Sequence, residues 1–382
     1  MSQRRRPNLT WLRRIITVFA LSIITVFPTI TAFPAFVSAS DMKTEPQEPQ
    51  VIEVSLEECR SLAMEHSASV LLAKSAVEDA KLSLEQTEAT NLTKPSPTSL
   101  YQSRMSLEST RKNLEITKQD IVLSTDQLYY SLLRAEHVVS ISEQALALAE
   151  RQLEIAMAKE SVGMATKLDI MRAANQTASA RNSLANALLN RDLAMVALNQ
   201  AIGFLPDTIL SLRDEFSYEK TGGLHLDASI EFALANRIEI AQAQSAVEIA
   251  DMNVELADNS FTPRLTYERA KLAAGDARVK LKEQQNKITL AVRQAYVALM
   301  QAEAKVELAG SKVNEARENL RITQLLFEAD MATNVEVLSA QNQYTQSRID
   351  SVQAIYDYNI TRSQFKRAIG DTAGLTGGVP GS

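Results

Sequence analysis

The sequence predicts an all-α protein built from two tandem repeats of a long antiparallel coiled-coil hairpin. The first observation is internal repetition: residues 121–203 align without a gap on residues 288–370, and 22 of the 83 aligned positions are identical. The second is a lack of helix breakers, because no proline lies between Pro97 and Pro206 and the first glycine of the chain is Gly163. Repetition marks each copy as one unit that needs neighbours to bury its apolar face. The breaker-free stretches favour long helices.

Apolar residues within the repeat recur at three- and four-residue spacing, which is typical of helices that pack along one another. Alanine is abundant in these rows, so neighbouring helices can approach closely. A hairpin of this kind has no globular core of its own, and we expect it to assemble with copies of itself. The row of the first copy contains Leu128, Leu132, Ala135, Val139, Leu146, Ala149 and Leu153.

The first 39 residues have the pattern of a signal peptide. Arginines 4–6, 13 and 14 precede an apolar run from Ile15 to about Phe36, and Val37-Ser38-Ala39 resembles a cleavage site. The run is also long enough to span a bilayer, so an uncleaved anchor remains an alternative. Either reading predicts an exported protein. Residues 40–54 are expected to be a flexible lead-in.

Composition excludes several classes of function. Residues 1–39 hold five of the 40 basic residues and no acidic ones, so the rest carries 35 basic and 46 acidic residues, a net charge of −11. This balance argues against nucleic-acid or anionic-lipid binding as the main task. Cys59 is the single cysteine, which excludes an intramolecular disulfide. The histidines, His66, His137 and His225, lie far apart. We therefore expect no metal, no cofactor and no catalysis.

The first repeat is expected over residues 55–203 and begins at a capping box formed by Ser55 and Glu58. A linker follows at 204–225. The expected elements of the first repeat are a helix from Ser55 to about Ala89, a break at Asn91–Ser99, a helix from about Leu100 to Ser161, a turn at 163–165 and a returning helix over 166–202.

The second repeat, residues 226–370, is expected to contain the same elements. A Gly-rich tail, residues 371–382, is predicted to be disordered. The expected elements are a helix over 227–257, a break at Asn259–Arg264, a helix over 266–328, a turn at Asp330-Met331-Ala332 and a returning helix over 333–369.

Taken together, the tandem repeat, the turn sequences and the terminal Ala-Ile-Gly of each copy resemble the TolC-type outer-membrane efflux proteins. The turn reads Gly163-Met-Ala-Thr-Lys-Leu-Asp169 in the first copy and Asp330-Met-Ala-Thr-Asn-Val-Glu336 in the second. The resemblance covers residues 55–370. It implies a homotrimer whose hairpins form a hollow α-helical tunnel, with a periplasmic adaptor joining it to an inner-membrane pump.

One departure from the family concerns the break in each repeat. There the family has two membrane strands, and a membrane strand needs about 9–11 residues. The breaks at Asn91–Ser99 and Asn259–Arg264 are too short for two strands and a turn. The resemblance therefore implies a tunnel without the family's membrane strands, in the outer membrane, the periplasm or the cell wall.

The hairpin turns are the candidate sites for adaptor docking, because loops that join rigid rods are natural contact points. Two acids just after the turns, Asp169 and Glu336, are candidates for a gate in the tunnel. These two acids also fit plain capping boxes at the start of their helices. The equivalent tyrosines of the two copies, Tyr129 and Tyr296, are expected to pack between helices. The docking residues are Gly163, Met164, Ala165 and Thr166 with Asp330, Met331, Ala332 and Thr333.

The function that the sequence favours most is a trimeric exit duct of a tripartite efflux or type I secretion system that passes small molecules or proteins. A structural coiled-coil protein of the envelope, solid rather than hollow, is the alternative. A periplasmic adaptor would have one hairpin flanked by β-rich domains, whereas this sequence has two hairpins and no such segments.

Overall fold

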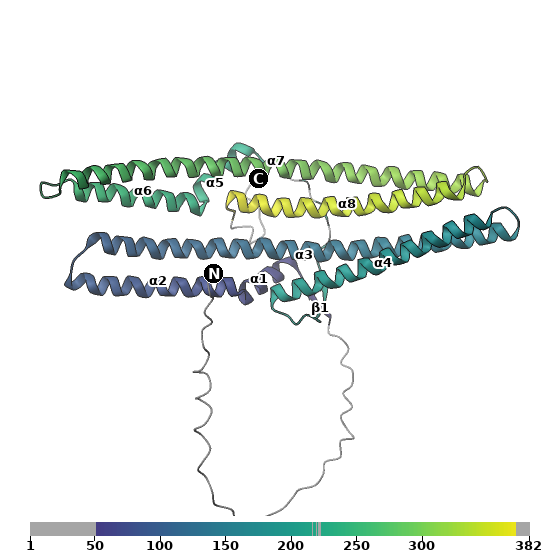
Figure 1. Ribbon diagram of the computed structural model, residues 1–382, viewed down its shortest axis with the longest axis horizontal. Coiled ribbons are helices and arrows are strands. Elements are labelled where there is room, and N and C mark those ends of the chain that lie inside the picture. The colour runs from purple at the N-terminus through teal and green to yellow at the C-terminus, as the bar shows by residue number, and fades with distance from the viewer. Residues whose placement is uncertain (1–50, 216, 219, 221–222, 372–382) are drawn as a thin grey trace, which may run out of the picture. The chain divides into compact units, whose positions relative to one another are not determined.

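The computed structural model describes residues 51–215, 217–218, 220 and 223–371, and it confirms the all-α class (Figure 1). The expected signal peptide and all but Asp371 of the expected tail lie outside the described residues. In chain order the elements are β1 (Val51–Val54), α1 (Leu56–His66), α2 (Ala68–Thr93), α3 (Pro97–Ser161), α4 (Lys167–Ile202), β2 (Ile209–Leu212), α5 (Leu226–Asn236), α6 (Ile238–Ala257), α7 (Arg264–Glu328) and α8 (Asn334–Ile369).

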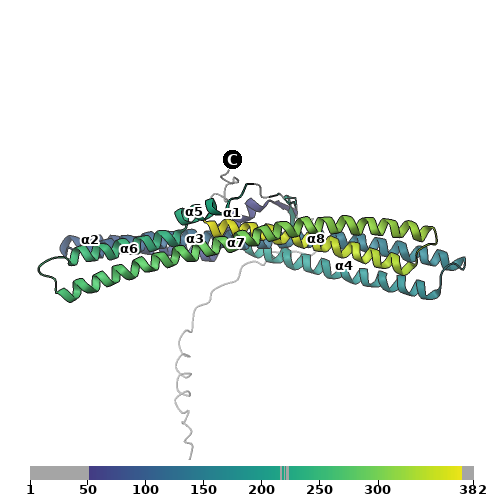
Figure 2. The ribbon, with the colours of Figure 1, turned by 90° about the horizontal axis from the view of Figure 1, so that it is seen from above.

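The repeat is visible in the helix lengths. Helices α3 and α7 have 65 residues each, and α4 and α8 have 36 each. At 1.5 Å per residue, a helix like α3 is roughly 100 Å long. Figure 2 shows α6 lying along the N-terminal part of α7 and α8 along its C-terminal part. Helices α2 and α4 contact α3 in the same way.

The predicted helix starts are confirmed by their caps. Glu58 N donates to Ser55 Oγ at 3.3 Å, and Ser55 N donates back to the Glu58 carboxylate at 2.7 Å. Thr166 and Thr333 form the same box with Asp169 and Glu336. The returning helices end at glycines 203 and 370, both in the left-handed conformation that closes many helices.

The expected single helix from Ser55 to about Ala89 is wrong, because the chain bends at Ser67. Ser67 adopts an extended conformation and caps α2, with Val70 N donating to its hydroxyl at 3.4 Å. Arg237 adopts a similar extended conformation between α5 and α6, without a side-chain cap, so the expected single helix over 227–257 is wrong as well. Each bend lies against the glycine that ends its own hairpin: His66 lies beside Gly203 and Arg237 beside Gly370. These contacts join residues more than a hundred positions apart, so no local sequence pattern predicts them.

Gly203 is expected to tolerate alanine poorly. Its φ is 82°, and an added Cβ would lie 2.5 Å from His66 Cγ. Gly163 is a matched control, since its φ is 79° but its Cβ would meet nothing within 4 Å. The backbone alone costs about 1–2 kcal/mol in this region. We therefore expect Gly203→Ala to lower the free energy of unfolding by more than Gly163→Ala does, measured in guanidinium chloride. Equal losses of unfolding free energy in the two variants would show that an alanine at position 203 does not clash with His66.

Two expected irregular segments contain strands instead. Residues 51–54 of the expected flexible lead-in form β1, which pairs in parallel with β2 from the expected linker. The register joins Val51 to Ile209 and Val54 to Leu212. Four-residue strands are too short for a periodic signal, and the pairing joins segments that are far apart in sequence. Val54 and Leu210 are buried where the strands cover α1 and α3.

The core lies in the middle of the long helices, at the α1 and α5 levels. In the first copy Tyr129 is fully buried, and its hydroxyl donates to Asp214 at 2.7 Å. Tyr296 is partly buried and packs edge-on against Phe365 at 6.3 Å between ring centres. The expected packing of both tyrosines between helices is confirmed. Burial and the bond to Asp214 raise the pKa of Tyr129 far above its usual range.

Cys59 is expected to be inert in the folded protein. It is buried in the same core, and burial, with smaller contributions from Glu58 and Asp214, raises the pKa of its thiol to about 12. Because the thiolate is the reactive form, Ellman's reagent at pH 8 should detect no thiol until denaturant is added. Stoichiometric reaction of the native protein would contradict this burial.

The connections at the breaks are short. Lys94–Ser96 joins α2 to α3, and residues 258–263 join α6 to α7. None of the helices in the described part of the chain is both long and apolar enough to cross a membrane.

Candidate docking site at the two hairpin tips

Each hairpin turns within a few residues at its tip, and both turns use a left-handed residue. Gly163 has a φ of 79° and Asp330 a φ of 57°, and Asp330 is the one non-glycine residue with positive φ among those described. The N–H of the following methionine closes each turn: Met164 N donates to Lys159 O at 2.8 Å, and Met331 N to Leu326 O at 2.7 Å. Both methionine side chains are exposed.

The two tips are bound to each other by a lysine that the sequence analysis missed. Lys159 Nζ donates to Asp330 Oδ1 at 2.7 Å and to Phe327 O at 3.1 Å. The same ammonium lies 4.1 Å from the centre of the Phe327 ring, within the range of a cation–π interaction. The repeat equivalent of Lys159 is Leu326, so this contact has no counterpart in the repeat pattern.

A second link joins the tips through Asn334, the first residue of α8. Its side chain is buried, accepts from Gln152 Nε2 at 2.7 Å and donates to Asp169 O at 3.3 Å. Farther along the same helices, Gln176 Nε2 donates to Asn342 Oδ1 at 2.6 Å. Direct polar contacts from α3 and α4 to α8 therefore bind the first copy to the second, and the tips form one continuous surface.

A groove of about 470 Å³ runs between the tips. Six of the ten predicted site residues line it, whereas Gly163, Thr166, Met331 and Glu336 do not. Its lining consists of Ala156, Lys159, Met164, Ala165, Asp169, Phe327, Asp330, Ala332, Thr333 and Asn334. Apolar side chains thus lie beside one fixed cation and several acceptors, and of these residues Met164 and Phe327 are the types enriched at protein interfaces.

The two candidate gate acids are both engaged in capping their own helices. Asp169 binds the Thr166 hydroxyl at 2.7 Å and Thr166 N at 3.0 Å, and these bonds lower its pKa. Glu336 binds Thr333 in the same way, and the bond from Thr333 N is the main cause of its lowered pKa. Both carboxylates therefore stay ionised at neutral pH. Capping accounts for their geometry, and the gate remains a prediction.

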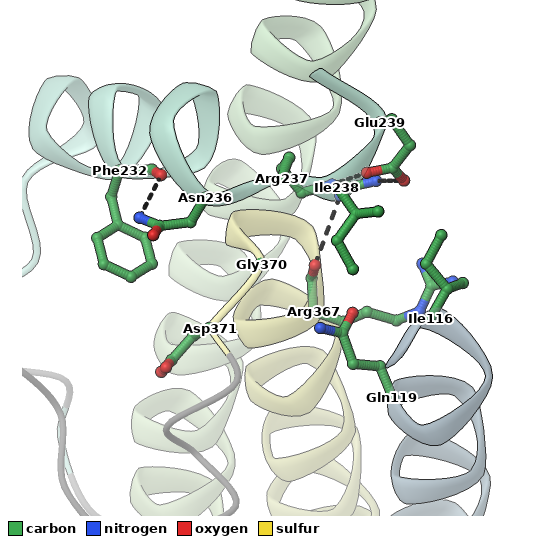
Figure 3. A pocket seen from close by; sticks show the side chains of 10 residues that line it. All are labelled: Ile116, Gln119, Phe232, Asn236, Arg237, Ile238, Glu239, Arg367, Gly370 and Asp371. Carbon is green, nitrogen blue, oxygen red and sulfur yellow. Dashed lines mark hydrogen bonds and ion pairs between the residues drawn. The ribbon is translucent and has the colours of Figure 1, made fainter. Parts of the chain in front are cut away.

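A second cavity, of about 130 Å³, lies where α5 meets α6 (Figure 3). Arg237 Nη1 donates to Ala368 O at 2.9 Å. Figure 3 shows the contacts of Arg237 with Glu239, which accepts from Arg237 Nε at 2.8 Å, and with Arg367 O. Arg367 Nε donates to Asp120 at 2.7 Å. These groups satisfy the end of α8 and hold it to α3, so the cavity is part of a structural joint. Among the described residues no cluster of metal-binding side chains occurs.

Comparisons with known proteins agree with this geometry. Residues 98–204, which contain nearly all of α3 and α4 and the first tip, match the family described as outer membrane efflux protein. A search of curated protein sequences finds no match.

Solved outer-membrane channels have the same fold at low sequence identity. CusC matches with a TM-score of 0.69 and 14% identity, over 82% of this chain and 92% of that one. The Vibrio cholerae outer membrane protein VceC gives 0.64 and 14%, over 82% and 96%. The Neisseria gonorrhoeae outer membrane channel MtrE gives 0.63 and 15%, over 82% and 88%. The protein therefore resembles the outer membrane efflux proteins, in sequence over residues 98–204 and in fold over 82% of the chain.

Proposed function

We propose that three copies of this chain form a tunnel in the cell envelope, the exit duct of a tripartite efflux or type I secretion system. The duct has no chemistry of its own. It receives small molecules or proteins from an inner-membrane pump, and a periplasmic adaptor holds the pump to the hairpin tips. The similarity to outer membrane efflux proteins and the shared fold support this assignment.

One observation supports the assembly directly: equivalent positions of the two copies differ sharply in exposure. Ile141 on α3 is 4% exposed, whereas its equivalent on α7, Leu308, is 57% exposed. Ile360 on α8 is 9% exposed, whereas its equivalent on α4, Leu193, is 68% exposed. Helices α3 and α8 face each other within the chain, while α4 and α7 lie at the two outer sides of the four helices (Figure 1). The outer helices thus carry the apolar residues of a contact that a single chain leaves unmade.

The repeat also indicates the register of that missing contact. Within the chain, Arg134 on α3 donates to Gln353 on α8 at 2.7 Å. The repeat equivalent of Arg134 is Gln301 on α7, 167 positions later, and that of Gln353 is Asn186 on α4, 167 positions earlier. If α7 of one copy meets α4 of the next as α3 meets α8, these two side chains face each other across the boundary. Both are amides, so they can hydrogen-bond there.

The test is a chain that carries Gln301→Cys and Asn186→Cys, treated with a short bismaleimide. We expect covalent dimers and trimers on a denaturing gel, with no larger ladder, because a closed ring of three has no free edge. Cys59 is buried and does not compete. The control pairs Asn186→Cys with Glu315→Cys, which lies 14 residues farther along α7, roughly 21 Å away. Equal cross-linking of both pairs, or ladders beyond three, would contradict the proposed ring.

Docking of an adaptor at the tips is a separate part of the proposal. The exposed Met164 and Met331 suit contact with another helix tip. Replacing both by Asp should abolish co-purification of the adaptor while the mass of the trimer stays unchanged. An adaptor that still co-purifies with the intact variant trimer would place docking elsewhere.

A further inference from the structure

We propose that a groove formed by α3, α4 and α8 lies on the inner wall of the tunnel and binds uncharged molecules in transit that carry several hydroxyl or amide groups. This groove, called the amide groove below, lies between the hairpin tips and the core in the middle of the long helices. The inference names a class of substrate, and it therefore rests on the proposed tunnel.

The composition of the amide groove favours an uncharged ligand. The groove has a volume of about 520 Å³, within the range of small-molecule sites. Fifteen described residues line it, and none of these carries a charge. Ten of the fifteen have a hydroxyl or a side-chain amide, and the other five are apolar. A charged ligand would lose its hydration here without gaining an oppositely charged partner.

One lining residue indicates that the amide groove takes a ligand. Gln341 of α8 is only 6% exposed, yet its amide forms no hydrogen bond with any described residue. A buried amide without a partner is unfavourable. The neighbouring Asn342, in contrast, accepts from Gln176 Nε2 of α4 at 2.6 Å. Gln341 therefore offers both a donor and an acceptor to a molecule in the groove.

The repeat shows that this lining is not a general feature of helix packing in the chain. The equivalent of Gln341 in the first copy is Ala174. The equivalent of Ala145, which lines the groove, is Lys312 on α7, and Glu315 on α7 replaces a second apolar lining residue. In a ring of three, the equivalent positions at the boundaries between chains would thus be charged and lack the glutamine. The uncharged groove occurs within each chain.

The amide groove opens on the side of α3 that faces away from α1. Asp126 and Leu133 of α3 contact α1, Asp126 through Arg60 and Leu133 in the shared core. Ser142 and Ala149, which line the groove, each follow one of these two residues by 16 positions. At about 100° per residue, this spacing turns the side chains by about 160° around the helix.

This orientation places the amide groove inside the proposed tunnel. Figure 2 shows α1 and α5 on one side of the long helices. Because α1 and α5 would obstruct an open centre, they belong on the outside of a hollow ring, and the opposite side faces the passage. A site along a passage must bind weakly enough to release its ligand. Amides and hydroxyls without a charge suit such weak binding.

The first test measures binding of the disaccharide of N-acetylglucosamine to the exported protein by a ligand-observed NMR titration. This probe is uncharged and carries hydroxyl and acetamido groups. Gln341→Leu should weaken its binding about tenfold, as expected for one lost hydrogen bond. The variant should be as stable as the unmodified protein, because the amide has no partner to lose among the described residues. Gln364→Leu, an exposed position on the same helix, is the matched control and should not change binding.

A charged form of the same probe tests the class of ligand. The deacetylated disaccharide has the same sugar rings, but its amines are protonated at neutral pH. We expect it to bind about tenfold more weakly or worse, because no carboxylate lines the amide groove to replace the lost hydration.

The second test determines which side of the assembled protein the amide groove faces. Ser183→Cys places a thiol at the groove, and Glu65→Cys places one on the exposed surface of α1. In protein with the mass of three chains, a small maleimide should label both variants. A maleimide on a long polyethylene glycol chain should label the Glu65→Cys variant and not the Ser183→Cys variant. Cys59 is buried and does not compete.

Three results in a trimeric protein would each overturn the proposal. They are unchanged binding of the probe to the Gln341→Leu variant, equal binding of the charged disaccharide, and equal labelling of both cysteine variants by the long reagent. A protein with the mass of a single chain would instead overturn the tunnel itself. Failure of the amide groove and failure of the tunnel are therefore distinguishable.

Discussion

A chain carrying Leu193→Glu and Leu308→Glu is expected to be a monomer. Both side chains are exposed in the single chain and belong to the outer rows of α4 and α7. Each boundary between copies would lose two buried leucines and gain charges that have no partner, a loss of roughly 5 kcal/mol or more per boundary. That corresponds to a weakening of about a thousandfold or more in each contact. Analytical ultracentrifugation at micromolar concentration should give the mass of one chain.

The helix content of this variant should not change, because neither leucine packs within the chain. Its circular dichroism spectrum therefore separates lost assembly from lost folding. The matched control is Met164→Glu with Met331→Glu, two exposed residues at the tips, which should leave the assembled mass intact. A Leu193/Leu308 variant that sediments like the unmodified protein would show that the outer rows are not the contact between copies.

Asp126→Ala is expected to produce the largest loss of stability. Asp126 is buried and accepts from Arg60 Nε at 2.6 Å, from Arg60 Nη2 at 2.7 Å and from Ser363 Oγ at 2.7 Å. The carboxylate thus joins α1, α3 and α8. Removing it takes the carboxylate from the part-buried Arg60 guanidinium, which keeps its ion pair with the exposed Glu57 at 3.1 Å. The loss is therefore about 3 kcal/mol, the lower end of the range for a broken buried pair. Chemical denaturation at a fixed protein concentration measures this, since assembly adds to the apparent stability.

Asp120→Ala is the matched control for that variant. Asp120 also links α3 to α8, through Arg367 Nε at 2.7 Å, but both side chains reach solvent. An exposed ion pair contributes at most about 1 kcal/mol. We therefore predict that Asp126→Ala costs more than Asp120→Ala by about 2 kcal/mol or more, although the two carboxylates lie six residues apart on one helix. Equal losses of stability in the two variants would mean that the Asp126 carboxylate is not shielded from water.

Much of this fold could be predicted because its signals are local. Helices α4 and α8 begin one residue after Thr166 and Thr333, as their capping boxes indicate. The stretches without proline predicted the lengths of α3 and α7 to within a few residues, although α7 contains Gly275 and Gly310. The bends at Ser67 and Arg237 were missed, although Ser67 is a local N-cap of α2. Both bends also lie against glycines more than a hundred residues away, contacts that the local sequence does not show. The β1–β2 pair depends on a similarly distant contact.

In the candidate site, too, the local sequence predicted the turns but not the contacts between distant residues. The repeated Met-Ala-Thr turn located both tips, and six of the ten residues chosen from it lie on one groove. The contacts that bring the tips together come from Lys159, Gln152 and Asn334. None of these is shared with its equivalent in the other copy. Such positions could have been found by asking where two otherwise similar repeats place different polar residues.

Electron microscopy of the exported protein, purified without cross-linking, together with its mass in solution, tests whether this chain assembles as a hollow ring of three. We predict a mass of three chains and end-on projections with three repeated subunits around an open centre. A single chain, a dimer, or a trimer whose end-on projections are filled would contradict the tunnel and favour a structural coiled-coil protein of the envelope.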